Sequence, residues 1–171
     1  MKSDPQTFAA PPASAALSIR IEREDPRNPQ AQDLLGESHA LMRSLFPPEH
    51  NHFLEVAQLC APNIRFFLAR TEAGDALGCI ALAQAEREGE VKSMFVAPQA
   101  RGMGVAGRLL ARLEQDAAAQ GITTLRLETG DALQDAVRFY RCHGFTQCGP
   151  FGTYADNGTS LFFEKQLVES Q

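Results

Sequence analysis

The stretch V-K-S-M-F-V-A-P-Q-A-R-G-M-G-V-A-G-R-L-L-A-R-L, residues 91–113, decides the fold. It begins with a short apolar run that ends before Pro98, which cannot continue a central strand because it has no backbone N–H. A loop with two glycines follows, and then leucines recur at helical spacing at positions 109, 110 and 113. The pattern predicts a strand that leads through a glycine loop into a helix.

This glycine loop has the chemistry of an anion site. The first amides of a helix have no intrahelical acceptor, and they lie at the positive end of the helix dipole. Gly102 and Gly104 remove the side chains that would keep a ligand away from these amides, and Arg101 adds a positive charge. We therefore expect a phosphate or pyrophosphate to bind here.

The composition is that of one globular domain with a sizeable core. The chain has 171 residues, of which 44% are hydrophobic and 22% are charged. A formal net charge of −5 without a basic face argues against nucleic-acid binding, and no apolar run is long enough to cross a bilayer. The first residues do not have the pattern of a secretory signal, and the four cysteines form no zinc motif. We expect a cytoplasmic protein with no membrane partner.

Periodicity and turn residues divide the chain into elements. Residues 1–16, rich in Ala, Pro and Ser, are expected to form a flexible leader, and residues 17–171 a single domain. Strands are predicted at 17–23, 63–70, 76–85, 89–96, 122–129 and 159–167, and helices at 30–46, 49–59, 104–120 and 132–142. This order predicts an α/β (α+β) fold with a mixed sheet flanked by helices.

Two patterns allow other interpretations. The segment P-P-E-H-N-H, residues 47–52, holds potential metal ligands, but no further ligand cluster lies near it in the sequence. We interpret it as a solvated loop without a metal. Residues 102–107 also match the G-x-G-x-x-G dinucleotide fingerprint, with Glu128 at a later strand end. The gap of five residues between Val96 and Gly102, and the place of the motif in mid-chain, disfavour this alternative.

Two blocks of the sequence resemble the acetyl-CoA-binding core of the GNAT-type N-acetyltransferases. The family's Q/R-x-x-G-x-G/A is matched by Gln99, Gly102 and Gly104, and its A-x-x-F/L-Y-x-x-x-G-F by residues 136–145. The resemblance covers about residues 17–167, and further matches, among them P-P-E-x-x-H at 47–52, resemble a bacterial YsnE-like subgroup. The resemblance implies a mostly antiparallel sheet that is splayed at its central strand.

The resemblance also implies how acetyl-CoA binds. The pantetheine arm would pair with the backbone of Met94, Phe95 and Val96, and an amide near the last of these would stabilise the oxyanion. The pyrophosphate would be held by the backbone amides of Arg101, Gly102, Met103, Gly104, Val105 and Ala106. Leu133 departs from the family's pattern, which has a cofactor-contacting Asn at this position.

Two side chains are candidates for the chemical step. Tyr140 resembles the family's general acid, which gives a proton to the departing thiolate. Glu128 alternates with Leu125 and Leu127 on its strand and therefore projects from the opposite face. It is predicted to act as general base, directly or through water, or to bind the ammonium of the acceptor. A surface salt bridge is the alternative role.

Other residues are predicted to shape the acceptor site. Glu90 and His52 are further candidates for the base. By likeness to the subgroup, the acceptor pocket would be lined by His52, Tyr154 and Ser160.

These features predict an acetyl-CoA-dependent N-acetyltransferase that needs no metal. A primary amine, on a small molecule or an amino-acid-like acceptor, would attack the thioester directly. No cysteine lies beside an obvious activating partner, which disfavours a covalent acetyl-cysteine route. A non-catalytic acyl-CoA-binding or sensing module is the alternative from another class. Monomer and homodimer are both compatible with the sequence.

Overall fold

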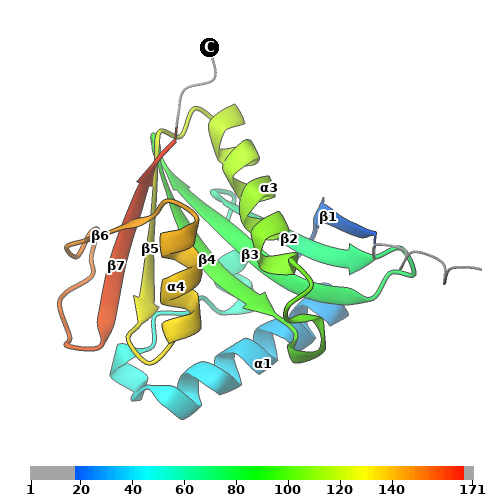
Figure 1. The fold of residues 1–171 in the computed structure, drawn as a ribbon, viewed down its shortest axis with the longest axis horizontal. Coiled ribbons are helices and arrows are strands. Elements are labelled where there is room, and N and C mark those ends of the chain that lie inside the picture. Colours follow the sequence, from blue (N-terminus) through cyan, green and yellow to red (C-terminus); the bar gives the residue numbers. More distant parts are fainter. Residues whose placement is uncertain (1–17, 168–171) are drawn as a thin grey trace, which may run out of the picture.

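The computed structural model of the chain describes residues 18–167 (Figure 1). The strands are β1 (Ile19–Arg23), β2 (Ile64–Thr71), β3 (Ala76–Ala85), β4 (Glu88–Val96), β5 (Thr124–Gly130), β6 (Thr146–Cys148) and β7 (Ser160–Gln166). The helices are α1 (Pro29–Leu45), α2 (Val56–Leu59), α3 (Val105–Ala119) and α4 (Gln134–Cys142), with short 3-10 turns η1 (Pro48–His50) and η2 (Pro98–Ala100). The predicted leader, residues 1–16, lies outside the described residues.

The described strands form one mixed sheet in the order β1-β2-β3-β4-β5-β7-β6. Every neighbouring pair is antiparallel except β4 and β5, which are parallel because α3 carries the chain back across the sheet between them. The β4–β5 pairing is short and joins residues 88–90 to residues 124–126. Beyond it the two strands separate. The mostly antiparallel mixed sheet, flanked by helices and splayed at its centre, is therefore confirmed.

The core lies on both faces of the sheet. Residues 77–82 of β3 are buried at every successive position, so both faces of this strand are covered. The helices that contact β3 are α1 and α3, and they therefore lie on opposite faces. The leucines predicted to face the core from α3, Leu109, Leu110 and Leu113, are all buried. This packing holds the start of α3 against the end of β4.

One predicted helix is wrong. Instead of a helix over residues 49–59, η1 ends at His50, residues 51–55 form no regular element, and α2 begins at Val56. Asn51 has left the helical region with a ψ of 117°, and its side-chain amide donates to the carbonyls of Phe46 and Pro47. Glu55 then caps α2 in a capping box with Gln58. The spacing of apolar residues over 49–59 is that of a helix, but the hydrogen bonds of Asn51 and the capping box of Glu55 interrupt it.

The strand β6 was not predicted from the sequence; it covers only residues 146–148 and pairs with β7 at the edge of the sheet. Its length is too short for a period-2 pattern to be recognised. Among the helices within residues 18–167, none is long and apolar enough to cross a membrane.

We expect Gly78→Ala to destabilise the fold, because a Cβ there would lie 2.7 Å from the carbonyl oxygen of Phe95 on β4. This oxygen is a backbone atom that cannot swing aside, and such overpacking typically costs about 1–3 kcal/mol. Gly36→Ala is the matched control, since Gly36 lies exposed in α1 with no atom within 4 Å of an added Cβ. This change should stabilise the helix by about 1 kcal/mol. Urea unfolding of both variants measures the effects, and equal midpoints would contradict the close approach of β3 and β4.

Candidate active site

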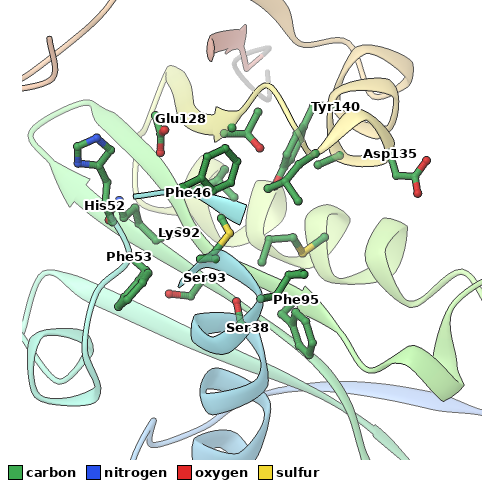
Figure 2. Close-up of a pocket in the computed structure, with 18 of the residues that line it drawn as sticks. Ser38, Phe46, His52, Phe53, Lys92, Ser93, Phe95, Glu128, Asp135 and Tyr140 are labelled. Carbon is green, nitrogen blue, oxygen red and sulfur yellow. Dashed lines mark hydrogen bonds between the residues drawn. The ribbon is translucent and has the colours of Figure 1, made fainter. Parts of the chain in front are cut away.

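A cleft of about 420 Å³ opens where β4 and β5 separate. Its walls come from the C-terminal half of α1, residues 50–53, β4, the end of β5 and α4 (Figure 2). The edge of β4 that faces β5 has no strand partner beyond Glu90 within the described part of the chain. Backbone N–H and C=O groups that lose water without a new partner cost free energy. An extended ligand in the cleft would supply these partners, in the manner of an added strand.

A β-bulge at Ser93 shapes this edge. Between the pairs Cys79–Phe95 and Ala81–Lys92, β4 has one residue more than β3. Ser93 has a φ of 54°, which is uncommon for a residue other than glycine. Its carbonyl accepts a hydrogen bond from Cys79 Sγ at 3.3 Å, and burial raises the pKa of this thiol to about 12, so that it stays protonated. Bulges and strained backbone of this kind concentrate at functional sites.

The loop between β4 and α3 presents backbone amides that have no acceptor. Gly102 and Gly104 have φ values of 79° and 78°, which glycine adopts most easily, and no atom lies within 4 Å of a Cβ at either position. No side chain caps the start of α3. The amides of Arg101 and Met103 donate to carbonyls within the loop. Among residues 101–106, the other four amides, those of Gly102, Gly104, Val105 and Ala106, have no acceptor within residues 18–167.

Tyr140 lies in α4 with its side chain in the wall of the cleft (Figure 2). It is 5% exposed and makes edge-to-face contacts with Phe139 and Phe145, with ring centroids 5.3 and 5.5 Å apart. Burial raises the pKa of Tyr140, so the hydroxyl is protonated at neutral pH. It has no hydrogen-bond partner among the described residues, which leaves its proton available. Leu133, at the start of α4, lines the same cleft and adds only apolar surface.

Glu128 lies near the end of β5, half-buried in the wall of the cleft. Leu125 and Leu127 are fully buried on the opposite face of the strand, as the alternation predicted. The Glu128 carboxylate forms no hydrogen bond and no ion pair with any residue in the range 18–167, so the surface salt bridge considered from the sequence is not formed there. A negative charge without a counterion thus lies in the same cleft as the Tyr140 hydroxyl.

A hydrogen-bond network around Lys92 was not indicated by the sequence. Lys92 Nζ lies 2.8 Å from Tyr154 Oη, 3.0 Å from the carbonyl oxygen of His52 and 3.3 Å from Glu90 Oε1. The Tyr154 hydroxyl donates to Glu90 over 2.5 Å. Burial, the bond to Glu90, and the charges of Glu90 and Glu128 raise the pKa of Tyr154. The network joins residues 51–55 and the β6–β7 loop to β4, and Glu90 compensates the charge of Lys92.

The remaining predicted residues are already engaged with neighbours. The His52 ring packs edge-on against Tyr154, with centroids 5.2 Å apart, and Ser160 Oγ accepts a hydrogen bond of 3.0 Å from Asn157. His50 Nδ1 lies 3.0 Å from Thr159 Oγ1. Within residues 18–167, no three His, Cys, Asp or Glu side chains are grouped so as to hold a metal ion.

Residues 51–55 are held against α1 by a buried histidine. The His39 ring stacks on Phe53 with centroids 4.1 Å apart, and its Nδ1 lies 3.9 Å from Glu55 Oε2. Burial lowers the pKa of His39, and the charge of Arg43 lowers it further, while Glu55 acts in the opposite direction. His39 Nε2 is buried and has no hydrogen-bond partner among the described residues. The folded protein therefore favours the neutral imidazole at this position.

Stability should consequently fall on acidification. The unfolded chain binds a proton at His39 near pH 6.5, whereas the folded chain binds it only at lower pH, so this contribution is complete above about pH 6.5 and is lost as the pH falls toward the folded pKa. His39→Phe retains the stacking and should flatten this part of the pH dependence. His143→Phe, which replaces an exposed histidine, is the control. Urea midpoints at about pH 7.5 and 5.5 test this, and the same loss in His39→Phe as in the unmodified chain would contradict it.

Comparison with known proteins identifies the family. The family model for the Acetyltransferase (GNAT) family matches residues 30–145, and the chain belongs to this family. It is 41% identical over 152 residues to an IAA acetyltransferase of Azospirillum brasilense, which covers 88% of this chain and 99% of the relative. It is 33% identical to the uncharacterized N-acetyltransferase YsnE of Bacillus subtilis, over 87% of this chain and 100% of the relative. The dinucleotide interpretation of the glycine loop is thereby set aside.

Solved structures agree with this assignment. A Klebsiella pneumoniae protein, provisionally named an acyl-CoA N-acyltransferase, superposes with a TM-score of 0.75 at 28% identity, covering 88% of this chain and 98% of the other. The PaiA N-acetyltransferase of Thermoplasma acidophilum, solved with coenzyme A, shares the fold with a TM-score of 0.69 at 16% identity, covering 88% and 99%. The protein is therefore a GNAT N-acetyltransferase, an enzyme that takes its acyl group from acyl-CoA.

Proposed function

We propose that the protein transfers an acetyl group from acetyl-CoA to the primary amine of a small or amino-acid-like acceptor, by direct attack. Acetyl-CoA supplies an activated carbonyl: the acceptor nitrogen bonds to it, the carbon–sulfur bond breaks, and the sulfur leaves as a thiolate. The protein must hold the thioester, receive a proton from the attacking amine and give a proton to the thiolate. The residues around the cleft can be assigned to these tasks.

The binding of acetyl-CoA is assigned to two backbone surfaces. The free edge of β4, at Met94, Phe95 and Val96, would pair with the pantetheine arm. The pyrophosphate would lie at the start of α3, where the amides of Gly102, Gly104, Val105 and Ala106 have no acceptor and Arg101 adds charge. Of the six amides expected from the resemblance, those of Arg101 and Met103 donate within the loop, so their role is to fix its shape.

Proton transfer is assigned to Glu128 and Tyr140. An ammonium group entering the cleft is attracted by Glu128, since this carboxylate has no counterion in the described range, and the same carboxylate can accept the proton that must leave before attack. The Tyr140 hydroxyl is protonated and without a partner there, and it can donate to the thiolate. Glu90 is less suited to be the base, because Tyr154 and Lys92 occupy its Oε1.

The observation that supports this function best is the placement of an uncompensated carboxylate and an unbonded, protonated hydroxyl in the cleft beside the unpaired edge of β4. The test is release of free thiol from acetyl-CoA in the presence of a panel of amines, amino acids and peptides. Release with at least one primary amine supports the proposal. Binding of acetyl-CoA without thiol release across the panel would contradict it and favour the non-catalytic acyl-CoA-binding module.

Tyr140→Phe should lower kcat by about 10²- to 10⁴-fold, the usual range for loss of a general acid, because only the hydroxyl is removed. The ring contacts with Phe139 and Phe145 remain, so the Kd for acetyl-CoA should change by less than about threefold. Steady-state kinetics and calorimetry measure the two effects. Unchanged turnover would remove Tyr140 from the mechanism.

Glu128→Gln should lower kcat for the amine on a similar scale, about 10²-fold or more, because glutamine has the same shape but cannot accept a proton. The KM for acetyl-CoA should stay nearly constant. Glu37→Gln, at an exposed position of α1, is the matched control and should leave both constants unchanged. A variant with normal kcat and a raised KM for the amine would show that Glu128 binds the ammonium and is not the base.

A further inference from the structure

The aromatic ring of Phe46 forms a wall of the cleft next to the proposed proton-transfer groups. Phe46 is the C-cap of α1, is 7% exposed and lines the same cleft as Glu128 and Tyr140. In the view of Figure 2 its ring lies between these two side chains. A Cβ at Gly130, two residues after Glu128 and on the same face of β5, would overlap this ring, so the ring borders the space that an acceptor held by Glu128 would enter.

The ring rests directly on the backbone of β5 at Gly130. A Cβ added to Gly130 would lie 2.0 Å from Phe46 Cζ and 2.6 and 2.7 Å from the two Cε atoms. Any other residue at position 130 would therefore displace the ring. The φ of Gly130 lies outside the left-handed region, so its backbone conformation does not require glycine. The glycine is needed because the ring occupies the space of a side chain.

The backbone at Phe46 is held by its neighbours. The Phe46 amide donates to the carbonyl of Met42 at 3.0 Å, and its own carbonyl accepts from the Asn51 side chain at 3.4 Å. Pro47 and Pro48 follow at once and restrict the backbone. The backbone that carries the ring is thus fixed by the end of α1 and by the Asn51 side chain.

We propose that Phe46, seated on Gly130, is a specificity-determining residue that admits primary amines borne on a CH₂ carbon and excludes those borne on a branched carbon, so that an amino-acid-like acceptor would react at a side-chain amine and not at its α-amine. This inference rests on the proposed function, since it places the reacting nitrogen between Glu128 and Tyr140. A substituent on the carbon next to that nitrogen would then meet the ring. Removing the ring opens this space while the proton-transfer groups stay in place.

The test uses benzylamine and α-methylbenzylamine, which differ by one methyl group on the carbon next to nitrogen. Calorimetry in the presence of saturating CoA should show benzylamine binding at least about tenfold more tightly to the unmodified protein, the usual effect of one misplaced methyl group. Phe46→Ala should reduce this ratio to below about threefold, and Phe46→Leu, which keeps more of the packing, to an intermediate value. Leu45→Ala, an exposed residue of the same helix turn outside the cleft wall, should keep the full ratio.

Gly130→Ala provides a second test of the same inference. Its methyl group should push the ring into the cleft and weaken benzylamine binding by about tenfold or more, while the Kd for CoA stays constant. Adding Phe46→Ala to Gly130→Ala should restore benzylamine binding to the level of Phe46→Ala alone.

The outcomes are distinct. No discrimination by the unmodified protein, binding of neither amine by any variant, or an unchanged ratio in Phe46→Ala would each overturn the inference. Because the experiment measures amine binding, its result does not depend on whether the protein releases thiol from acetyl-CoA. Failure of all amines to release thiol would contradict the proposed function. A loss of discrimination between the two amines in Phe46→Ala would still support the role of the Phe46 ring in specificity.

Discussion

The site depends on one constraint: β4 is paired along its whole length on one side and along only residues 88–90 on the other. The antiparallel partner β3 fixes the strand, and the bulge at Ser93 is part of that pairing. The opposite edge keeps backbone groups that no neighbouring strand reaches. The sheet therefore lacks a strand segment beside the end of β4, and the extended ligand proposed for the cleft would pair with this free edge.

The strand β4 also carries two of the charged side chains that decide the charge of the cleft, Glu90 and Lys92. Lys92 lines the cleft, and its amino group donates to Glu90, Tyr154 and the His52 carbonyl. These contacts leave Glu128 without a counterion among the described residues, although a lysine lies on the next strand. Glu90, Lys92 and Glu128 together therefore carry a net negative charge, which would suit the proposed ammonium, while the positive end of the α3 dipole would suit the proposed pyrophosphate.

The features that could be predicted from the sequence are those that depend on neighbouring residues. The features that could not be predicted depend on contacts between residues far apart in the chain. The strand–loop–helix order around Gly102 and Gly104, the leucine stripe of α3 and the alternation of Glu128 with Leu125 and Leu127 each depend on a few neighbouring residues, and each was predicted correctly. The contact of Phe46 with Gly130, and that of Lys92 with Tyr154, join positions far apart in the chain. Such pairs leave no periodic pattern. Residues 51–55 were predicted to be helical, but the Asn51 hydrogen bonds and the capping box of Glu55 interrupt the helix. The long-range stacking of Phe53 on His39 then holds the segment against α1.

The short parallel pairing between β4 and β5 has a mechanical consequence. The strands β1 to β4 form one antiparallel unit, and β5 to β7 form another. Within the described chain the two units are joined only by this seam, the short pairing of residues 88–90 with residues 124–126. A CoA molecule lying in the gap would contact both units at once and lengthen the seam. Binding of acetyl-CoA would then stabilise the folded protein, because only the folded arrangement of the two half-sheets offers this site.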